Sequence, residues 1–168
     1  LFGNVELKDP RLIGWLIGDG SYGFDKTPVL SNCDDSILNY VEANYTTVVE
    51  KQYLTKTNKT YKEIRIKNIC SILRGLKIYG QTGKNKTLPF NIFSYTENSI
   101  TELIGGLFDT DGYISKDYKI YLYSVSYKML NEVRFCLQKL GIHSNISLTK
   151  GRIKEGRKDK GDYYTLNI

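Results

Sequence analysis

Two stretches of the chain share one pattern of apolar, small and acidic residues. Residues 12–20 read Leu-Ile-Gly-Trp-Leu-Ile-Gly-Asp-Gly, and residues 104–112 read Ile-Gly-Gly-Leu-Phe-Asp-Thr-Asp-Gly. The two align without a gap, so that Asp111 lies 92 positions after Asp19. A gapless repeat at this separation predicts a fold made of two similar halves.

Each stretch is predicted to form a helix that packs closely against the other. Gly14 and Gly18 lie four residues apart in the first stretch, and Gly105 and Gly106 stand in the second. A glycine destabilises a helix by about 1 kcal/mol relative to alanine. A segment that keeps several glycines is therefore expected to need close approach of two backbones. One copy alone could be a buried helix with a simple turn, but the repeat argues against that alternative.

Both predicted helices end in an aspartate followed by a glycine. A carboxylate at this end meets the negative pole of the helix dipole, and a bound divalent cation would reverse that effect. If the helices pack side by side, Asp19 and Asp111 meet at one end. Two adjacent carboxylates predict a Mg²⁺ site.

The rest of the first half predicts a mixture of helices and strands. Asp34 or Asp35 is expected to cap a second helix, and Asn68 a third that ends at Gly80. Strands are predicted at residues 21–24, 27–32, 46–54 and 60–66. Residues 81–90 are predicted to be a linker between the halves.

The second half repeats the plan. Ser99 is expected to cap a helix over residues 100–110, and another apolar helical stripe stops at Gly141. Strands are predicted at residues 113–115, 119–126, 144–148 and 163–168. The predicted fold is α+β, with two pseudo-symmetric αββαββ(α) halves, residues 1–90 and 91–168. Their antiparallel sheets would flank the central helix pair and form a saddle.

Composition narrows the function classes. The 168 residues carry a net charge of +6 and have a pI near 9.1, which favours a polyanionic partner. Three cysteines without a Cys-x-x-Cys motif and a single histidine argue against a disulfide framework, a zinc site or a Ser-His-Asp triad. The cysteine usage predicts a reducing, intracellular location, in cytoplasm, nucleus or an organelle. No signal peptide or apolar membrane span is present in these residues.

The repeated stretches resemble the motif of LAGLIDADG homing endonucleases, and further elements extend the resemblance over residues 8–168. Residues 86–89, Lys-Thr-Leu-Pro, resemble the Lys-x-x-Pro element of endonucleases carried by inteins. Residues 124–130 and 137–142 resemble the Ser-x-Ser-x-x-Leu and Leu-x-x-Leu-Gly-Ile elements that follow. The first motif has Ile17 where the family often has an earlier aspartate, whereas the second keeps Asp109.

The resemblance implies a sequence-specific, Mg²⁺-dependent double-strand DNA endonuclease, with Mn²⁺ as an expected substitute. It implies catalytic roles for Asp19, Asp111 and Lys86. Metal ligands would be Asp19 and Asp111 with Gly18 and Thr110. Lys86 would be an auxiliary cation near the phosphate or the attacking water, and its alternative is an ordinary exposed linker lysine. A second auxiliary lysine is left unassigned, between Lys160 and a position beyond residue 168.

Double-stranded DNA is the expected partner, bound by a monomer with an internal pseudo-twofold axis. The chain is expected to be an excised endonuclease domain from an intein host. The candidate DNA contacts are basic and tyrosine residues of strands, with the cations of the loop 149–162: Lys51, Tyr53, Lys62, Arg65, Tyr121, Tyr123, Lys150, Arg152, Lys154, Arg157 and Lys158.

Two alternatives stay open from sequence. One is a catalytically inactive DNA-binding or RNA-splicing maturase module of the same fold, which would need neither aspartate. The other is a structural domain of a larger polypeptide, which would have no affinity for DNA.

Overall fold

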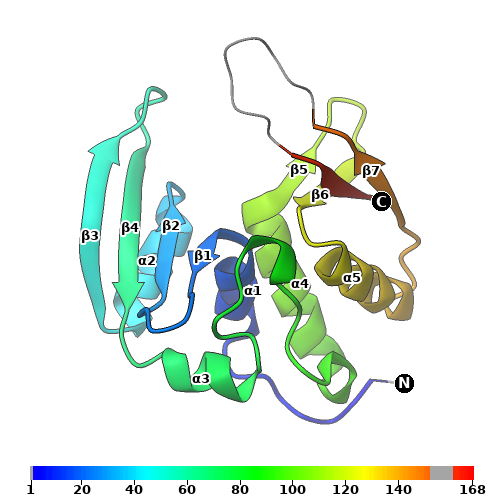
Figure 1. Cartoon of the computed structure of the whole chain (residues 1–168), viewed down its shortest axis with the longest axis horizontal. Coiled ribbons are helices and arrows are strands. Elements are labelled where there is room, and N and C mark those ends of the chain that lie inside the picture. The colour runs from blue at the N-terminus through cyan, green and yellow to red at the C-terminus, as the bar shows by residue number, and fades with distance from the viewer. Residues whose placement is uncertain (1, 152–160) are drawn as a thin grey trace.

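A computed structural model describes residues 2–151 and 161–168 and divides into two halves around a pair of helices (Figure 1). The elements of the first half are α1 (Pro10–Asp19), β1 (Gly20–Ser21), β2 (Val29–Asn32), α2 (Asp35–Asn44), β3 (Thr47–Leu54), β4 (Thr60–Ile66) and α3 (Cys70–Gly75). Two short 3₁₀ turns, η1 (Gly83–Asn85) and η2 (Ile92–Ser94), connect the halves. The elements of the second half are α4 (Glu97–Asp111), β5 (Gly112–Ile114), β6 (Ile120–Ser124), α5 (Tyr127–Lys139), β7 (Asn145–Thr149) and β8 (Tyr163–Asn167).

The two sheets have the same topology. Their strand orders are β1-β2-β4-β3 and β5-β6-β8-β7, and all neighbouring strands are antiparallel. Gly20 pairs with Leu30 in the first sheet, as Gly112 pairs with Leu122 in the second. The predicted α+β fold of two αββαββ(α) halves is therefore confirmed.

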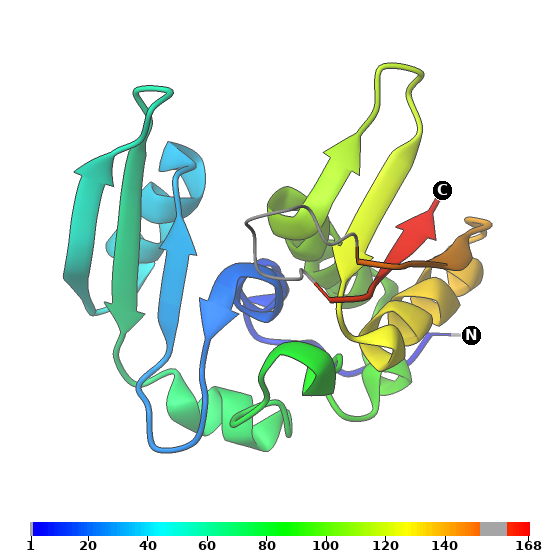
Figure 2. The ribbon, with the colours of Figure 1, turned by 45° about the horizontal axis from the view of Figure 1, so that its top comes forward.

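One face of each sheet is packed and the other is open. Side chains alternate between faces along a strand, and Ile64 and Ile66 of β4 are buried while Arg65 between them is exposed. The sheets lie on opposite sides of α1 and α4 and extend past the end of the pair, as the predicted saddle requires (Figures 1 and 2).

Two predicted helix starts need comment. Asp34, not Asp35, caps α2, because its carboxylate accepts a hydrogen bond from the Ser36 amide at 2.8 Å. The prediction that Ser99 caps the central helix of the second half is wrong. Thr96 is the cap and α4 begins at Glu97. Ser99 lies buried inside the helix, where its hydroxyl accepts from the Leu7 amide at 3.0 Å.

The prediction for the third helix is also wrong at both ends. Asn68 has a positive φ of 62° and does not cap α3, whose first turn has no side-chain cap. The helix ends at Gly75, five residues before Gly80. From there the chain returns to the first half, and the Gly80 amide donates to the Tyr22 carbonyl at 2.9 Å.

Two further features concern the cysteines and the apolar character of the helices. Cys33, Cys70 and Cys136 are all unpaired. In the part of the chain that the structure describes, none of the helices has the length and apolar character to span a membrane.

Candidate active site

The two central helices approach each other most closely at a pair of glycines. A Cβ added at Gly14 would overlap the Leu103 carbonyl and lie 2.9 Å from the Gly106 Cα. A Cβ added at Gly106 would overlap the Arg11 carbonyl. Gly105, by contrast, faces the end of the Arg11 side chain, which can move. Gly14 and Gly106 therefore form the crossing point that the repeated motif predicted.

The crossing brings the C-terminal ends of α1 and α4 together, and with them Asp19 and Asp111. Gly18 lies against the Thr110 side chain, and a Cβ there would be 3.4 Å from Asp111 Oδ2. Burial and, to a smaller extent, the nearby negative charge of Asp19 together raise the pKa of Asp111 to about 6, against the opposing charge of Lys86. Burial also raises the pKa of Asp19. Both carboxylates are thus withdrawn from water at one place, where their charges repel.

Lys86 lies at the same helix end and binds main-chain oxygens. Its Nζ donates to the carbonyls of Ile17 at 2.6 Å, Gly18 at 2.9 Å and Gly20 at 3.2 Å. An ammonium group has three donors, so all are used. Burial lowers the pKa of Lys86, and the charges of Asp111 and Asp19 oppose that effect. Lys86 is therefore not the exposed linker lysine that was the alternative interpretation.

Asn32 holds Asp19 in place and was missed from sequence. Its Nδ2 donates to Asp19 Oδ2 at 2.7 Å, while its Oδ1 accepts from the amides of Cys33 and Asp34, each at 2.7 Å. This hydrogen bond opposes the rise in the pKa of Asp19. The signal in the sequence is weak. Asn32 follows Leu30 on the packed face of β2, where a polar residue must find partners.

The second half has serines in the corresponding place. Ser124 occupies the position of Asn32, since Leu122 corresponds to Leu30, but its hydroxyl accepts from the Ser126 amide at 3.1 Å. The buried Ser126 hydroxyl donates to the Lys86 carbonyl at 2.7 Å and so fixes the connection between the halves. Among the described residues, none donates a hydrogen bond to the Asp111 carboxylate.

A small cavity adjoins Asp111 and is suited to a cation. It measures about 230 Å³ and is lined by Gly18, Lys86, Asp111, Tyr123 and Ser124 among others. Within residues 2–151 and 161–168 there is no cluster of three His, Cys, Asp or Glu side chains. Mg²⁺, however, is commonly held by one or two carboxylates together with water and substrate phosphates. Two half-buried carboxylates with raised pKa values fit such an ion.

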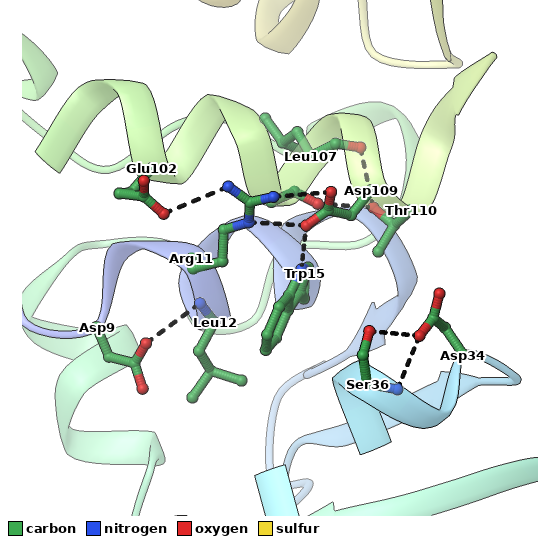
Figure 3. Close-up of polar contacts among 11 residues, drawn as sticks. Asp9, Arg11, Leu12, Trp15, Asp34, Ser36, Glu102, Leu107, Asp109 and Thr110 are labelled. Atoms are coloured by element: carbon green, nitrogen blue, oxygen red, sulfur yellow. Dashed lines mark hydrogen bonds and ion pairs between the residues drawn. The ribbon is translucent and has the colours of Figure 1, made fainter. Parts of the chain in front are cut away.

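The two further ligands implied by the resemblance are already engaged. The Gly18 carbonyl accepts from Lys86 at 2.9 Å. The Thr110 hydroxyl donates to the Leu107 carbonyl at 3.0 Å inside α4, as Figure 3 shows. The Gly18 carbonyl keeps a second lone pair, so the roles of Gly18 and Thr110 as ligands stay predictions, and the two aspartates are the charged donors of the site.

A second polar network joins α1 to α4 away from the cavity (Figure 3). The Asp109 carboxylate accepts from Arg11 Nε at 2.7 Å, from Arg11 Nη2 at 2.9 Å and from Trp15 Nε1 at 2.8 Å. Arg11 also pairs with Glu102 at 3.3 Å. A bidentate guanidinium–carboxylate pair is geometrically specific. The network therefore fixes the rotation of α4 about its axis, and with it the direction of Asp111.

The candidate DNA contacts of the first sheet fall on two faces. Lys51 and Arg65 lie on the open face, where Lys51 pairs with Glu63 at 3.4 Å and Arg65 pairs with Glu50. Tyr53 shares that face and its ring lies 4.7 Å from that of Tyr61. Lys62 lies on the opposite face, where it pairs with Glu42 of α2 at 2.8 Å. Lys62 is therefore not on the surface that the other candidates share.

The open face of the second sheet is built from tyrosines. Tyr121 and Tyr123 have ring centroids 6.2 Å apart, and Tyr113 and Tyr163 contact the same cluster. Lys150 is exposed at the start of the loop that leaves this sheet. The loop candidates Arg152, Lys154, Arg157 and Lys158, and the unassigned Lys160, lie outside the described residues, so their contacts stay predictions.

The sequence of this chain is similar to a family model and to segments of two longer proteins. The family model of a LAGLIDADG-like domain matches residues 98–168. The ATP-dependent DNA helicase Hel308 of Methanocaldococcus jannaschii is 32% identical over 175 residues, which cover 95% of this chain and 14% of the helicase. The glutamine–fructose-6-phosphate aminotransferase of the same organism is 25% identical over 146 residues, covering 83% of this chain and 13% of that enzyme. The chain thus spans about one seventh of the length of either relative.

Solved structures share the fold of the whole chain. A mesophilic variant of the homing endonuclease I-DmoI superimposes with a TM-score of 0.56 at 14% identity, covering 95% of this chain and 87% of that chain. A variant of I-DmoI in complex with its target DNA and manganese superimposes with a TM-score of 0.55 at 15% identity, covering 95% and 85%. At these identities the likeness concerns the fold.

Proposed function

We propose that this chain is a LAGLIDADG endonuclease, which cleaves double-stranded DNA at a specific sequence with the help of a divalent cation. The proposal is supported by the LAGLIDADG-like family model that matches residues 98–168 and by the fold that the whole chain shares with a homing endonuclease. The observation that carries the proposal is the meeting of Asp19 and Asp111 at one end of the helix pair, between two open sheet faces. A DNA-binding module without cleavage would gain nothing from two half-buried, mutually repelling carboxylates. Such a pair lowers stability unless a cation neutralises it.

The metal site of the proposal consists of Asp19 and Asp111. A divalent cation bound there, Mg²⁺ with Mn²⁺ as substitute, supplies Lewis acidity toward the scissile phosphate and its attacking water. The chain's own residues fix the geometry. Asn32 orients Asp19 through its 2.7 Å hydrogen bond, and the Asp109 network orients the end of α4. Lys86 places a positive charge beside both carboxylates and holds the last turn of α1 through three carbonyls.

The reaction class is hydrolysis of a phosphodiester. A water oxygen forms a bond to phosphorus and gives up a proton to solvent, while the bond from phosphorus to one sugar oxygen breaks and that oxygen takes up a proton from solvent. With one carboxylate from each half, we propose that each half serves one DNA strand. The open sheet faces on both sides would contact the duplex, since two-stranded ribbons fit the major groove.

The proposal includes a monomer carried inside a longer host polypeptide in the cell. Both helices of the central pair belong to one chain, so a monomer brings Asp19 and Asp111 together without a second subunit. Two relatives whose names describe unrelated reactions, a DNA helicase and an aminotransferase, share this one segment over about one seventh of their length. A segment common to such different enzymes is better explained as an inserted module than as part of either activity, which supports an intein host.

A cleavage selection tests the proposal. The chain is incubated with a plasmid library that carries randomised sites, in Mg²⁺, Mn²⁺, Ca²⁺ or EDTA, and the linear products are sequenced. We expect linear plasmid with a common sequence at its ends in Mg²⁺ or Mn²⁺ and none in EDTA. Enrichment of a bound sequence in Ca²⁺ without cleavage in any metal would favour the inactive binding or maturase alternative. Absence of any DNA binding would favour a structural domain.

A further inference from the structure

The open face of the first sheet carries two carboxylates at the centre of the surface that meets DNA in the proposed function. Glu63 of β4 stands between Ser31 of β2 and Lys51 of β3. Glu50 of β3 pairs with Arg65 of β4. A carboxylate repels the phosphates of a duplex. On a surface that binds phosphates, two carboxylates therefore need a role of their own.

A β-bulge in β3 places these charges on one face. The register of β3 against β4 shifts between Val49 and Lys51. As a result Lys51, and not Glu50, stands opposite Glu63. Strict alternation would have turned Lys51 to the covered face and set the two carboxylates against each other. Bulges that re-aim a side chain are frequent next to functional sites. The bulge thus gives each carboxylate a cation on the open face.

The carboxylates lie deeper in the surface than the cations that accompany them. The side chains of Glu50 and Glu63 are 30% and 29% exposed. Those of their partners, Arg65 and Lys51, are 45% and 58% exposed. Both carboxylates line a hollow of about 550 Å³, to which Ser31 also contributes. A duplex on this face would meet the cations with its phosphates and would bring base edges toward the carboxylates.

Glu63 keeps acceptor capacity in this arrangement. Its Oε1 accepts from the Tyr61 hydroxyl at 3.1 Å and from Lys51 Nζ at 3.4 Å. Within the part of the chain that the structure describes, no donor reaches its Oε2. An ionised carboxylate has about four lone-pair sites on its two oxygens. The ion pairs therefore leave room for a hydrogen bond from a ligand.

Cytosine is the base whose edge suits such an acceptor. In the major groove, cytosine N4 and adenine N6 are the hydrogen-bond donors. Adenine presents its N7 acceptor beside that donor, which repels a carboxylate, whereas the amide of a glutamine satisfies both groups. We propose that Glu50 and Glu63 are specificity-determining residues, each accepting from the N4 amino group of a cytosine in the half-site bound by the first sheet. This readout rests on the proposed function, because it acts only if the sheet face meets DNA.

The same carboxylates select against other sequences. Guanine and thymine present acceptors at the major-groove positions where cytosine presents its donor. A carboxylate that faces them is repelled and loses water without gaining a partner. Discrimination of this kind lowers the affinity for random duplex as well as favouring the target.

Glutamine substitutions test the proposal, because glutamine keeps the shape of the side chain and prefers adenine. Sites are selected by binding in Ca²⁺ from a randomised duplex library and sequenced, for the unchanged chain, Glu50→Gln and Glu63→Gln. In each variant we expect one position to change from cytosine to adenine. Both positions should lie in the same half of the site. Affinity for random duplex should rise by about threefold or more, because a repelling charge is removed.

Glu42→Gln is the matched control for charge. It removes the same charge, but Glu42 pairs with Lys62 at 2.8 Å on the helix-covered face, so the selected site should not change. A base substitution gives a second measurement that depends on no variant. Replacing either cytosine of the selected site by thymine should weaken binding of the unchanged chain by about tenfold or more. The matching glutamine variant should lose this preference for cytosine over thymine.

The outcomes separate this readout from the proposed function. If Glu50→Gln and Glu63→Gln select the same site as the unchanged chain, the carboxylates do not read bases. The same conclusion follows if Glu42→Gln changes the site as they do, or if thymine is accepted at both positions. In each of these cases the endonuclease proposal stands. If the unchanged chain enriches no site at all, the proposed function fails, and the readout fails with it.

Discussion

Asp19 and Asp111 end matching helices, yet only one of them is held by a neighbour. Asp19 receives a 2.7 Å hydrogen bond from Asn32, whereas the corresponding Ser124 hydroxyl serves the Ser126 amide. Burial and the charge of Asp19 raise the pKa of Asp111 to about 6, while at Asp19 the hydrogen bond from Asn32 opposes the rise that burial causes. A repeat that keeps its carboxylates can thus differ in what surrounds them.

The open faces of the two sheets also differ in their side chains. The open face of the first sheet carries ion pairs, Lys51 with Glu63 and Arg65 with Glu50. The open face of the second carries a tyrosine cluster that includes Tyr121 and Tyr123. The common feature is the helix pair, and the differences increase away from it. This pattern fits a partner whose two halves are not identical.

The largest expected effect concerns the feature that both halves share. Asp19→Asn and Asp111→Asn should each reduce double-strand cleavage by about 10³-fold or more, because loss of a metal ligand removes several kcal/mol of transition-state stabilisation. Affinity for target DNA in Ca²⁺ should change little, since volume and shape are kept. Plasmid linearisation and filter binding measure the two quantities. If either variant linearises target plasmid at the wild-type rate, that carboxylate is not part of the site.

The next effect tests the contact on which the comparison depends. Gly14→Leu and Gly106→Leu should lower the free energy of unfolding by about 1–3 kcal/mol or more through overpacking. Gly105→Leu is the comparison and should cost less, because a side chain there displaces the Arg11 guanidinium from its partners but leaves the two backbones in place. Urea unfolding monitored by Trp15 fluorescence gives the values. Equal stabilities for all three variants would contradict the close crossing.

Much of this comparison could be predicted from sequence, because the repeat specifies it. The alignment of residues 12–20 with 104–112 predicts the helix pair, its glycine contact and the meeting of Asp19 with Asp111. Alternating apolar residues predict most strands to within a few residues, as with the strand predicted at residues 60–66 and β4 (Thr60–Ile66). These features depend on local periodicity, which a sequence displays.

What the sequence did not predict depends on contacts between distant residues. The resemblance implied a role for Lys86 at the site, but its position in the predicted linker gives no sign of its partners, and only the fold brings its Nζ to carbonyls 66 to 69 positions away. Ser99 is a good cap by type, but Thr96 comes first and the Leu7 amide needs a buried acceptor. The extent of α3 was overestimated because the chain leaves the helix after Gly75 and returns to the first half, where the Gly80 amide donates to the Tyr22 carbonyl at 2.9 Å.

A third prediction sharpens the difference between the two carboxylates. The folded-state pKa of Asp111, about 6, exceeds its ordinary value of 3.8. The folded state therefore binds more protons than the unfolded state between about pH 4 and pH 6, and the free energy of unfolding falls as pH rises through this window. At pH 7 in EDTA, Asp111→Asn should be more stable than the unchanged chain by about 1–2 kcal/mol, allowing for partial solvent screening.

Asp19→Asn is the matched control for this effect. Its stabilisation should be smaller, because Asn32 already donates to the carboxylate and the substitution disturbs that hydrogen bond. Urea titrations at pH 4, 5, 6 and 7 follow both variants. The comparison is wrong if Asp19→Asn is stabilised as much as Asp111→Asn, or if Asp111→Asn keeps the wild-type pH dependence.

The smallest expected effect separates the two sheet faces. Lys51→Ala with Arg65→Ala should flatten the dependence of log affinity on log salt by about 0.9 for each phosphate that is no longer neutralised. Tyr121→Ala with Tyr123→Ala should weaken binding without changing that slope, since tyrosine carries no charge to release counterions. Lys62→Ala is the control for charge alone, because Lys62 lies on the helix-covered face with Glu42 and should leave the slope unchanged. Anisotropy titrations of the selected target at several salt concentrations measure all three. A reduced slope for Lys62→Ala, or an unchanged one for the Lys51 and Arg65 pair, would mean that the open face of the first sheet is not the surface that meets the phosphates.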